Sequence, residues 1–146
     1  MKAVEFLAFS LKVLKEDASP AGLRSAISRA YYAAFHAARE FLEGMNISGL
    51  SKGPGAHGDA PKLLVRTGDP AIDQVGHDLA HLHGERISAD YRMDQSHIEK
   101  LEVAAALVNQ ASEVIATLRK CSVEATRYLT VTRAVKQRSL QLQGLS

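Results

Sequence analysis

The chain has 146 residues, 46% of them hydrophobic, so it is long enough to bury a core of its own without disulfides or metals. Aromatic residues make up 5% and tryptophan is absent, which favours closely packed helices over a β-sandwich. The single cysteine excludes an internal disulfide, and no run approaches the roughly 18 apolar residues of a membrane span. We therefore expect a soluble, cytoplasmic, all-α protein.

Positive charge gathers near the end of the sequence. From Arg119 onward six basic residues stand against one acid, Glu124, so this segment carries +5 and the remainder −3 of a net charge of +2. A basic segment of this kind suits contact with RNA phosphates, and Arg127 and Arg133 are its candidate phosphate-binding residues. A solvated end that keeps the protein soluble is an equally good alternative.

The first two predicted helices cover residues 2–15 and 20–43. Apolar residues recur along both at spacings of three and four, which is the period of a helix face that packs on a core. Ser19 can cap the second helix and Pro20 suits its first turn, whereas Gly44 is a typical helix end. This pattern predicts a pair of consecutive amphipathic helices.

Glycine density changes abruptly after the second helix. Residues 44–60 contain five glycines and one proline, which predicts a mobile loop, and a short helix is expected over residues 61–66. Asp69-Pro70 repeats the cap-and-proline signal and starts a helix that reaches about Ser88. This helix is expected to pack through an apolar stripe of Ile72, Val75, Leu79 and Leu82.

The clearest helical pattern lies between residues 101 and 118. Its apolar positions alternate spacings of three and four, a narrow seam for a bundle neighbour or a dimer partner. Beyond Cys121 a weaker helix is expected, and its glutamine-rich end suggests fraying. The sequence thus predicts an up-and-down bundle of four to five helices over residues 1–120, with residues 121–146 as a basic C-terminal helix or tail of the same domain.

Four segments carry a resemblance to a known family. In chain order they are Ser-Arg-Ala-Tyr-Tyr-Ala-Ala-Phe-His at 28–36, Ala-His-Gly at 56–58, Leu-Val-Arg-Thr-Gly at 64–68 and Leu-His-Gly-Glu-Arg-Ile-Ser-Ala-Asp-Tyr at 82–91. In order and spacing they resemble landmarks of the small, stand-alone prokaryotic HEPN-like proteins, over about residues 20–118. The resemblance implies a HEPN-like helical bundle that forms a homodimer, needs no cofactor and is often the toxin partner of a nucleotidyltransferase antitoxin.

The resemblance also implies a chemistry. Active members of the family are metal-independent ribonucleases with an Arg-x4-6-His motif contributed by both protomers. Histidine can move the proton of a 2′-hydroxyl, and arginine can stabilise the charged phosphorane that forms when this hydroxyl attacks the adjacent phosphate. Here Arg86 takes the arginine position, but Asp90, Tyr91 and Arg92 stand where the histidine is expected.

Two other pairs have the motif's spacing. Arg29 precedes His36 with six residues between, and Arg92 precedes His97 with four, although about one such match is expected by chance in a chain of this composition. A site assembled in space is the other possibility, because Arg29 and Arg86 can face one cleft if their helices are neighbours, with His57 closing over it. The alternative is that both arginines pair with acids such as Glu40 or Asp90 and only hold the bundle together.

The sequence therefore offers a short set of candidate site residues. The candidate catalytic residues are Arg29, His36, His57 and Arg86, and the candidate RNA- or phosphate-binding residues are Tyr32, Tyr91, Arg127 and Arg133. Tyr31 is expected in the core. His77 and His81 have the i, i+4 spacing of zinc ligands, but a solvated polar face explains them better, and no metal site is predicted.

Three functions are consistent with these residues. The leading hypothesis is a dimeric HEPN-type toxin that binds RNA, possesses metal-independent endoribonuclease activity and is controlled by a nucleotidyltransferase antitoxin. The second hypothesis is a non-catalytic HEPN-like module that binds a nucleotide, RNA or protein. It is favoured because the histidine of the Arg-x4-6-His motif is missing after Arg86. A dimerisation bundle without a ligand is the third. No membrane contact is expected.

Overall fold

The computed structural model describes residues 2–47, 50 and 56–144, which form six α-helices and no strand. The helices are α1 (Ala3–Glu16), α2 (Pro20–Glu43), α3 (Ala56–Leu64), α4 (Pro70–Tyr91), α5 (Leu101–Val123) and α6 (Ala125–Leu142). The predicted all-α class is confirmed. The described residues contain six helices where four to five were expected, because the short helix predicted over 61–66 is α3, which spans Ala56–Leu64, and the segment after Cys121 forms the complete helix α6.

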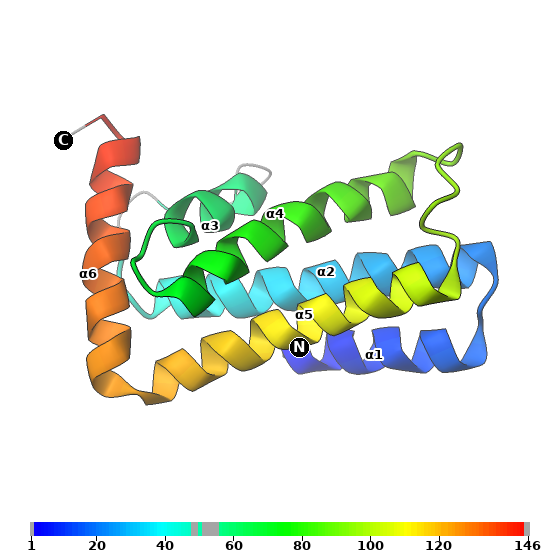
Figure 1. The fold of residues 1–146 in the computed structure, drawn as a ribbon, viewed down its shortest axis with the longest axis horizontal. Coiled ribbons are helices and arrows are strands. Elements are labelled where there is room, and N and C mark those ends of the chain that lie inside the picture. Colours follow the sequence, from blue (N-terminus) through cyan, green and yellow to red (C-terminus); the bar gives the residue numbers. More distant parts are fainter. Residues whose placement is uncertain (1, 48–49, 51–55, 145–146) are drawn as a thin grey trace.

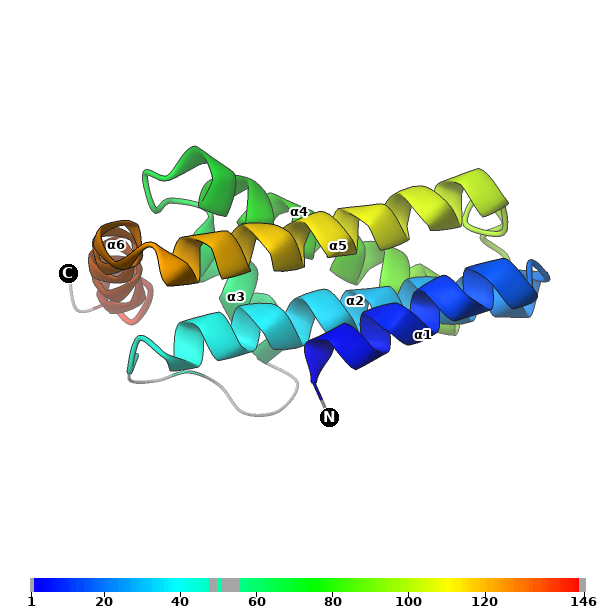
Figure 2. The same cartoon turned by 90° about the horizontal axis from the view of Figure 1, so that it is seen from below.

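Four long helices alternate in direction and form a bundle. Helix α2 lies in the middle and packs against α1, α4 and α5, as Figures 1 and 2 show. Helix α1 is shorter than α2 and covers only the half of it that is nearer the α1–α2 turn (Figure 1). Helix α3 is held between α2, α4 and α6, and α6 crosses the end of the bundle.

The predicted helix starts are confirmed by their caps. The Ser19 side chain accepts a hydrogen bond from the Gly22 N–H, and Asp69 accepts from the backbone of Ala71 and Ile72. Each cap is followed by a proline in the first turn, whose missing N–H costs no hydrogen bond there. Helix α2 ends at Glu43, with Gly44 as its C-cap.

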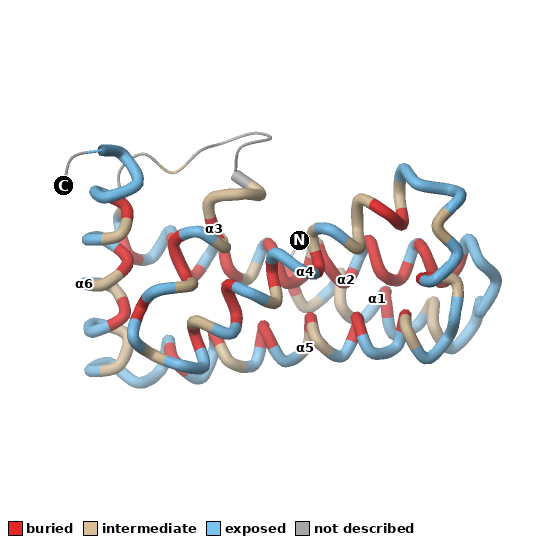
Figure 3. The backbone as a smooth tube through the Cα atoms, turned by 45° about the horizontal axis from the view of Figure 1, so that its top comes forward, coloured by how far each residue is buried: buried red, intermediate tan, exposed pale blue. Residues whose placement is uncertain are grey.

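The core lies between α2, α4 and α5. Figure 3 shows the buried positions running along the inner sides of the helices. Tyr31 is 1% exposed, as expected for a core residue. The predicted seam of the fifth helix is confirmed at Ala104, Val108, Ala111, Ile115 and Leu118, which are all buried, whereas Leu101 is half exposed.

Helix α5 is also long and apolar enough to cross a membrane by length and composition alone. Here it packs against α2, α4, α1 and α6. A helix that packs against several neighbours needs apolar residues on several sides, and this packing accounts for the apolar composition of α5.

The prediction of a loop over residues 44–60 was wrong for its last part, because α3 begins at Ala56 and contains Gly58. Residues 48–49 and 51–55 of that loop lie outside the described part. The helix buries Ala60, Leu63 and Leu64, and it packs on α4. Burial of these side chains outweighs the cost of about 1 kcal/mol for a glycine in a helix.

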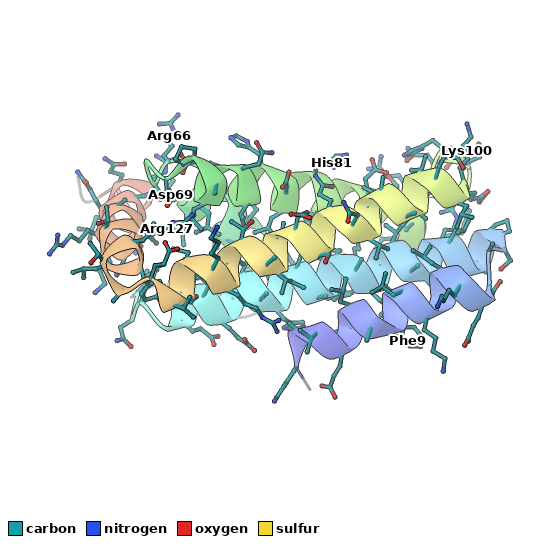
Figure 4. The ribbon with its side chains drawn as sticks, turned by 60° about the horizontal axis from the view of Figure 1, so that its bottom comes forward. Phe9, Arg66, Asp69, His81, Lys100 and Arg127 are labelled. Carbon is teal, nitrogen blue, oxygen red and sulfur yellow. The ribbon has the colours of Figure 1, made fainter. Side chains whose placement is uncertain are left out.

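Helix α6 runs to Leu142 instead of fraying, and buries Val131 and Val135. Arg127 ties it to the start of α4. Its Nε lies 2.6 Å from Asp69 Oδ2 and its Nη2 lies 3.0 Å from Oδ1. Figure 4 shows the two side chains pointing toward each other across the junction of α6 and α4.

Candidate functional site

Six polar and aromatic side chains from three helices meet beside the core. We call this group the imidazole–arginine cluster; it consists of Tyr31, Tyr32 and His36 of α2, His57 of α3, and His83 and Arg86 of α4. Two pairs in the cluster are hydrogen-bonded: Tyr31 with His57, 26 residues apart in the sequence, and Tyr32 with Arg86, 54 residues apart. Only the folded bundle brings such distant residues together. Three of the four resembling segments contribute to it.

His57 and His83 form the centre of the cluster. Their rings are parallel within 4° and their centroids lie 5.5 Å apart. The ring of Phe35 stacks on His57 at 4.3 Å. Burial lowers the pKa of His57, and the charges of His83 and Arg86 lower it further. Burial and the charge of Arg86 lower the pKa of His83 as well, so both rings are neutral near pH 7.

Tyr31 holds His57 in place. Its hydroxyl lies 2.6 Å from His57 Nδ1, and burial raises the pKa of the phenol far above its usual range, so the phenol stays protonated. Whichever of the two atoms donates, Nδ1 is engaged and Nε2 is the ring nitrogen outside this hydrogen bond. The contact therefore fixes the orientation of an imidazole that can exchange a proton.

Arg86 lies at the edge of the cluster. Its Nη2 donates to the Tyr32 hydroxyl, and its guanidinium carbon lies 5.1 Å from the centre of the Tyr32 ring and 5.6 Å from that of Tyr91. Its Nε is 3.0 Å from Asp90 Oδ2 but is buried without an aligned hydrogen bond. No described residue accepts a hydrogen bond from Nη1. The two N–H groups of Nη1 thus have no acceptor among the described residues, although Asp90 already balances part of the charge.

Tyr91 is 69% exposed, and Asp90 accepts a hydrogen bond of 3.1 Å from Ser28. The expected alternative, in which Arg86 pairs with Asp90, is therefore present. It does not exclude a ligand, because an ion pair at i, i+4 that is partly open to solvent is weak.

Arg29 does not join the cluster. It is exposed on α2, and no hydrogen bond or ion pair to it is formed within the described residues, so it pairs neither with Glu40 nor with an acid of another helix. His36 is exposed too, but its ring stacks on Phe6 of α1 with centroids 5.4 Å apart. Of the two residues with the motif's spacing, only His36 contacts a member of the imidazole–arginine cluster.

Arg127 and Arg133 lie on α6, at the end of the bundle. Arg127 is engaged by Asp69 and Glu124, and the Asp69 hydrogen bonds raise its pKa further. Arg133 is exposed. The structure therefore gives Arg127 a structural contact and leaves Arg133 on the surface.

The histidines with metal-like spacing remain apart. His77 is exposed, and His81 Nδ1 lies 3.0 Å from Gln110 Oε1, in the position that Figure 4 labels at the edge of α4. Among the described residues no group of three or more potential ligands could hold a metal ion. His97, the other motif histidine, contacts Glu85 at 3.0 Å.

Sequence reasoning missed Arg24. This residue is 8% exposed and donates to the Glu99 carboxylate and to five backbone carbonyls, those of Ser88, Ala89, Arg92, Met93 and Gln95. It therefore holds the end of α4, on which Tyr91 stands. The available signal was its position, because Arg24, Ser28, Tyr31 and Phe35 all lie on one buried stripe of α2.

No protein-family model, no curated protein and no solved structure matches this chain. The geometry of the imidazole–arginine cluster and the resembling segments are therefore what bears on function.

Proposed function

We propose that the protein is a HEPN-type RNA-binding protein with metal-independent endoribonuclease activity, and that its site is the imidazole–arginine cluster. One observation carries the proposal: His57 and His83, both with a lowered pKa, face each other at 5.5 Å beside Arg86. In the proposed reaction one neutral imidazole takes the proton of a 2′-hydroxyl as it attacks the adjacent phosphate. The imidazolium that forms then returns this proton to the leaving 5′-oxygen, directly or through the facing imidazole.

Arg86 has the complementary role. Its guanidinium lies at the edge of the cluster, where it can stabilise a phosphate held beside the two imidazoles. Tyr32 orients it through the bond from Nη2, and the exposed ring of Tyr91 offers a face on which a base can stack. One P–O bond forms between the 2′-oxygen and the phosphorus, and one breaks between the phosphorus and the 5′-oxygen. A proton passes from the 2′-hydroxyl to the leaving oxygen.

The biological role follows from the resemblance. We propose that the chain is a toxin that acts as a homodimer in the cytoplasm and is controlled by a nucleotidyltransferase antitoxin. Expression of the chain is then expected to arrest growth, and co-expression of the nucleotidyltransferase encoded beside it is expected to restore growth. Arrest without any decay of cellular RNA would separate toxicity from the proposed cleavage.

A cleavage assay tests the chemistry directly. Purified protein is incubated with transfer RNA in EDTA, and His57→Gln, His83→Gln and Arg86→Gln are compared with the surface control His77→Gln, which lies on α4 like His83 and Arg86. Loss of an acid or base typically costs about 10²- to 10⁴-fold, so the two cluster histidines are expected to fall by that range and the control by less than about twofold. Circular dichroism confirms that each variant is folded.

Cleavage that is unchanged in both cluster variants would refute the assignment of the site. A non-catalytic RNA- or nucleotide-binding module is the second candidate, and it is favoured because Asp90, Tyr91 and Arg92 stand where the motif's histidine is expected. It predicts no cleavage by the wild type but a raised melting temperature with RNA, which Arg86→Gln weakens.

A further inference from the structure

A hollow beside the cluster has the shape and polarity of a base-binding site. It has a volume of about 370 Å³ and is lined by Phe6 of α1 and by His36, Arg39, Glu40 and Glu43 of α2. The four α2 residues follow one another at spacings of three, one and three, so they share one face of the helix opposite Phe6. We call it the Phe6–His36 hollow. The volume lies in the range of small-molecule pockets, about 300–1,000 Å³.

The hollow has an aromatic wall where Phe6 of α1 meets His36 of α2. The rings of Phe6 and His36 are parallel within 13°, with centroids 5.4 Å apart, although His36 is otherwise exposed. Because His36 is exposed, the outer part of this stacked pair borders solvent and offers an aromatic surface to a ligand. Nucleobases stack on such faces whatever their sequence, so this wall explains binding of a base but not its identity.

Carboxylates form the polar edge of the hollow. Glu40 has no hydrogen-bond partner among the described residues, and Arg39 Nε donates to Glu43 Oε1 at 3.2 Å, which leaves Glu43 Oε2 as a further acceptor. The carboxylate oxygens of Glu40 and Glu43 only accept hydrogen bonds, so a base that binds here must present adjacent N–H donors. Guanine alone has two of them, N1–H and N2–H, on its pairing edge, and its O6 acceptor would lie toward the positive charge of Arg39.

The other bases fit this edge less well. Adenine has one donor next to a ring nitrogen that accepts, and uracil and cytosine each direct a carbonyl oxygen at a carboxylate. Each of these leaves a carboxylate facing an acceptor, which a site built to accept hydrogen bonds rejects.

The hollow also adjoins the proposed catalytic group. The His36 ring lies 6.4 Å from that of Tyr32, and the charges of His36 and Arg39 both act on His57. We propose that the Phe6–His36 hollow is a guanine subsite, which binds the base next to the phosphodiester held by the imidazole–arginine cluster. The inference rests on the proposed function for the phosphate, whereas the recognition of guanine rests on the hollow alone.

Binding of uncleavable RNA tests the subsite. Fluorescein-labelled 2′-fluoro pentamers UUGUU, UUAUU, UUCUU and UUUUU, which lack the attacking hydroxyl, are titrated with the full chain and followed by anisotropy. A bidentate contact to one base discriminates by about 5- to 150-fold, so UUGUU is expected to bind that much more tightly than the others. Glu40→Gln and Glu43→Gln are each expected to reduce the ratio of the UUUUU to the UUGUU dissociation constant below about threefold.

Two further variants separate stacking from recognition. Phe6→Leu is expected to weaken all four pentamers alike, since it removes the stacking wall. Glu113→Gln removes an exposed carboxylate of α5 and is expected to leave every affinity unchanged.

The outcomes also separate the subsite from the proposed function. Equal affinity for the four pentamers, or a guanine preference that survives both glutamate substitutions, would overturn the subsite even if transfer RNA is cleaved. A guanine preference without any cleavage would support the subsite and overturn the ribonuclease. No binding of any pentamer at low salt would overturn both.

Discussion

Arg24 is the residue whose removal should most disturb the end of α4. It is buried, and its guanidinium donates to Glu99 at 3.0 Å, to Ser88 O at 2.9 Å and to Gln95 O at 2.7 Å, with three longer bonds to neighbouring carbonyls. Arg24→Ala removes all of these donors at once. It leaves a partly buried carboxylate and several carbonyls to find water.

The size of the effect follows from these contacts. Removal of one partner of a buried ion pair costs about 3–5 kcal/mol, and the loop carbonyls regain part of their hydrogen bonding from water. We therefore expect Arg24→Ala to lower the free energy of unfolding by about 3–4 kcal/mol, which is about 10 °C in melting temperature for a domain of this size. Arg24→Lys keeps a charge for Glu99 but cannot span the carbonyls, so about half of that loss is expected.

Urea unfolding followed by circular dichroism measures these differences. Arg29→Ala is the matched control, because Arg29 lies one and a half turns further along the same helix, is exposed, and has no partner among the described residues. It is expected to change stability by less than about 0.5 kcal/mol. A loss below about 1 kcal/mol for Arg24→Ala would show that the carbonyls are held by other means, and the reasoning would be wrong.

Two further predictions concern charge. Arg127→Ala should destabilise by about 1–2 kcal/mol in urea unfolding, because Asp69 loses a bidentate partner, whereas Arg133→Ala should not; equal effects would mean that the Asp69 pair contributes nothing. The pKa of His57 and that of His83 lie below the usual 6.5, so unfolded imidazoles bind protons first as the pH falls. The free energy of unfolding is therefore highest above about pH 6.5 and decreases as the pH falls toward the folded-state pKa values. This decrease should be smaller when both histidines are replaced by glutamine. An unchanged decrease would show that burial of the two histidines is not its cause.

The helices could be predicted because each leaves a local signal. Ser19-Pro20 and Asp69-Pro70 mark the starts of α2 and α4, and the spacing of apolar residues marks the faces that the bundle buries. The start of α3 left no such signal. Gly58 disfavours a helix locally, and only the packing of Leu63 and Leu64 against α4 compensates for it, which is a tertiary effect.

The site could be predicted only in part, for a related reason. His57 and Arg86 were named from their segments, but the sequence could not show that His83 would face His57, since the two rings come from helices whose relative position is set by the fold. His83 lies in the resembling segment 82–91 but is not among the candidate residues that the sequence offered. Arg29 has the motif's spacing to His36, but it is exposed and forms no hydrogen bond or ion pair with a described residue of the cluster.

The four resembling segments prove to have different physical roles. Segment 64–68 builds a turn: Gly68 has a φ of +85°, which favours glycine, and the Thr67 N–H and hydroxyl both donate to Asp73 in the first turn of α4. The other three supply the side chains of the cluster. Because the turn fixes where α4 starts and Arg24 fixes where it ends, both His83 and Arg86 lie on a helix anchored at each end. A proton-transfer site needs such rigid support, and a surface that merely attracts RNA does not.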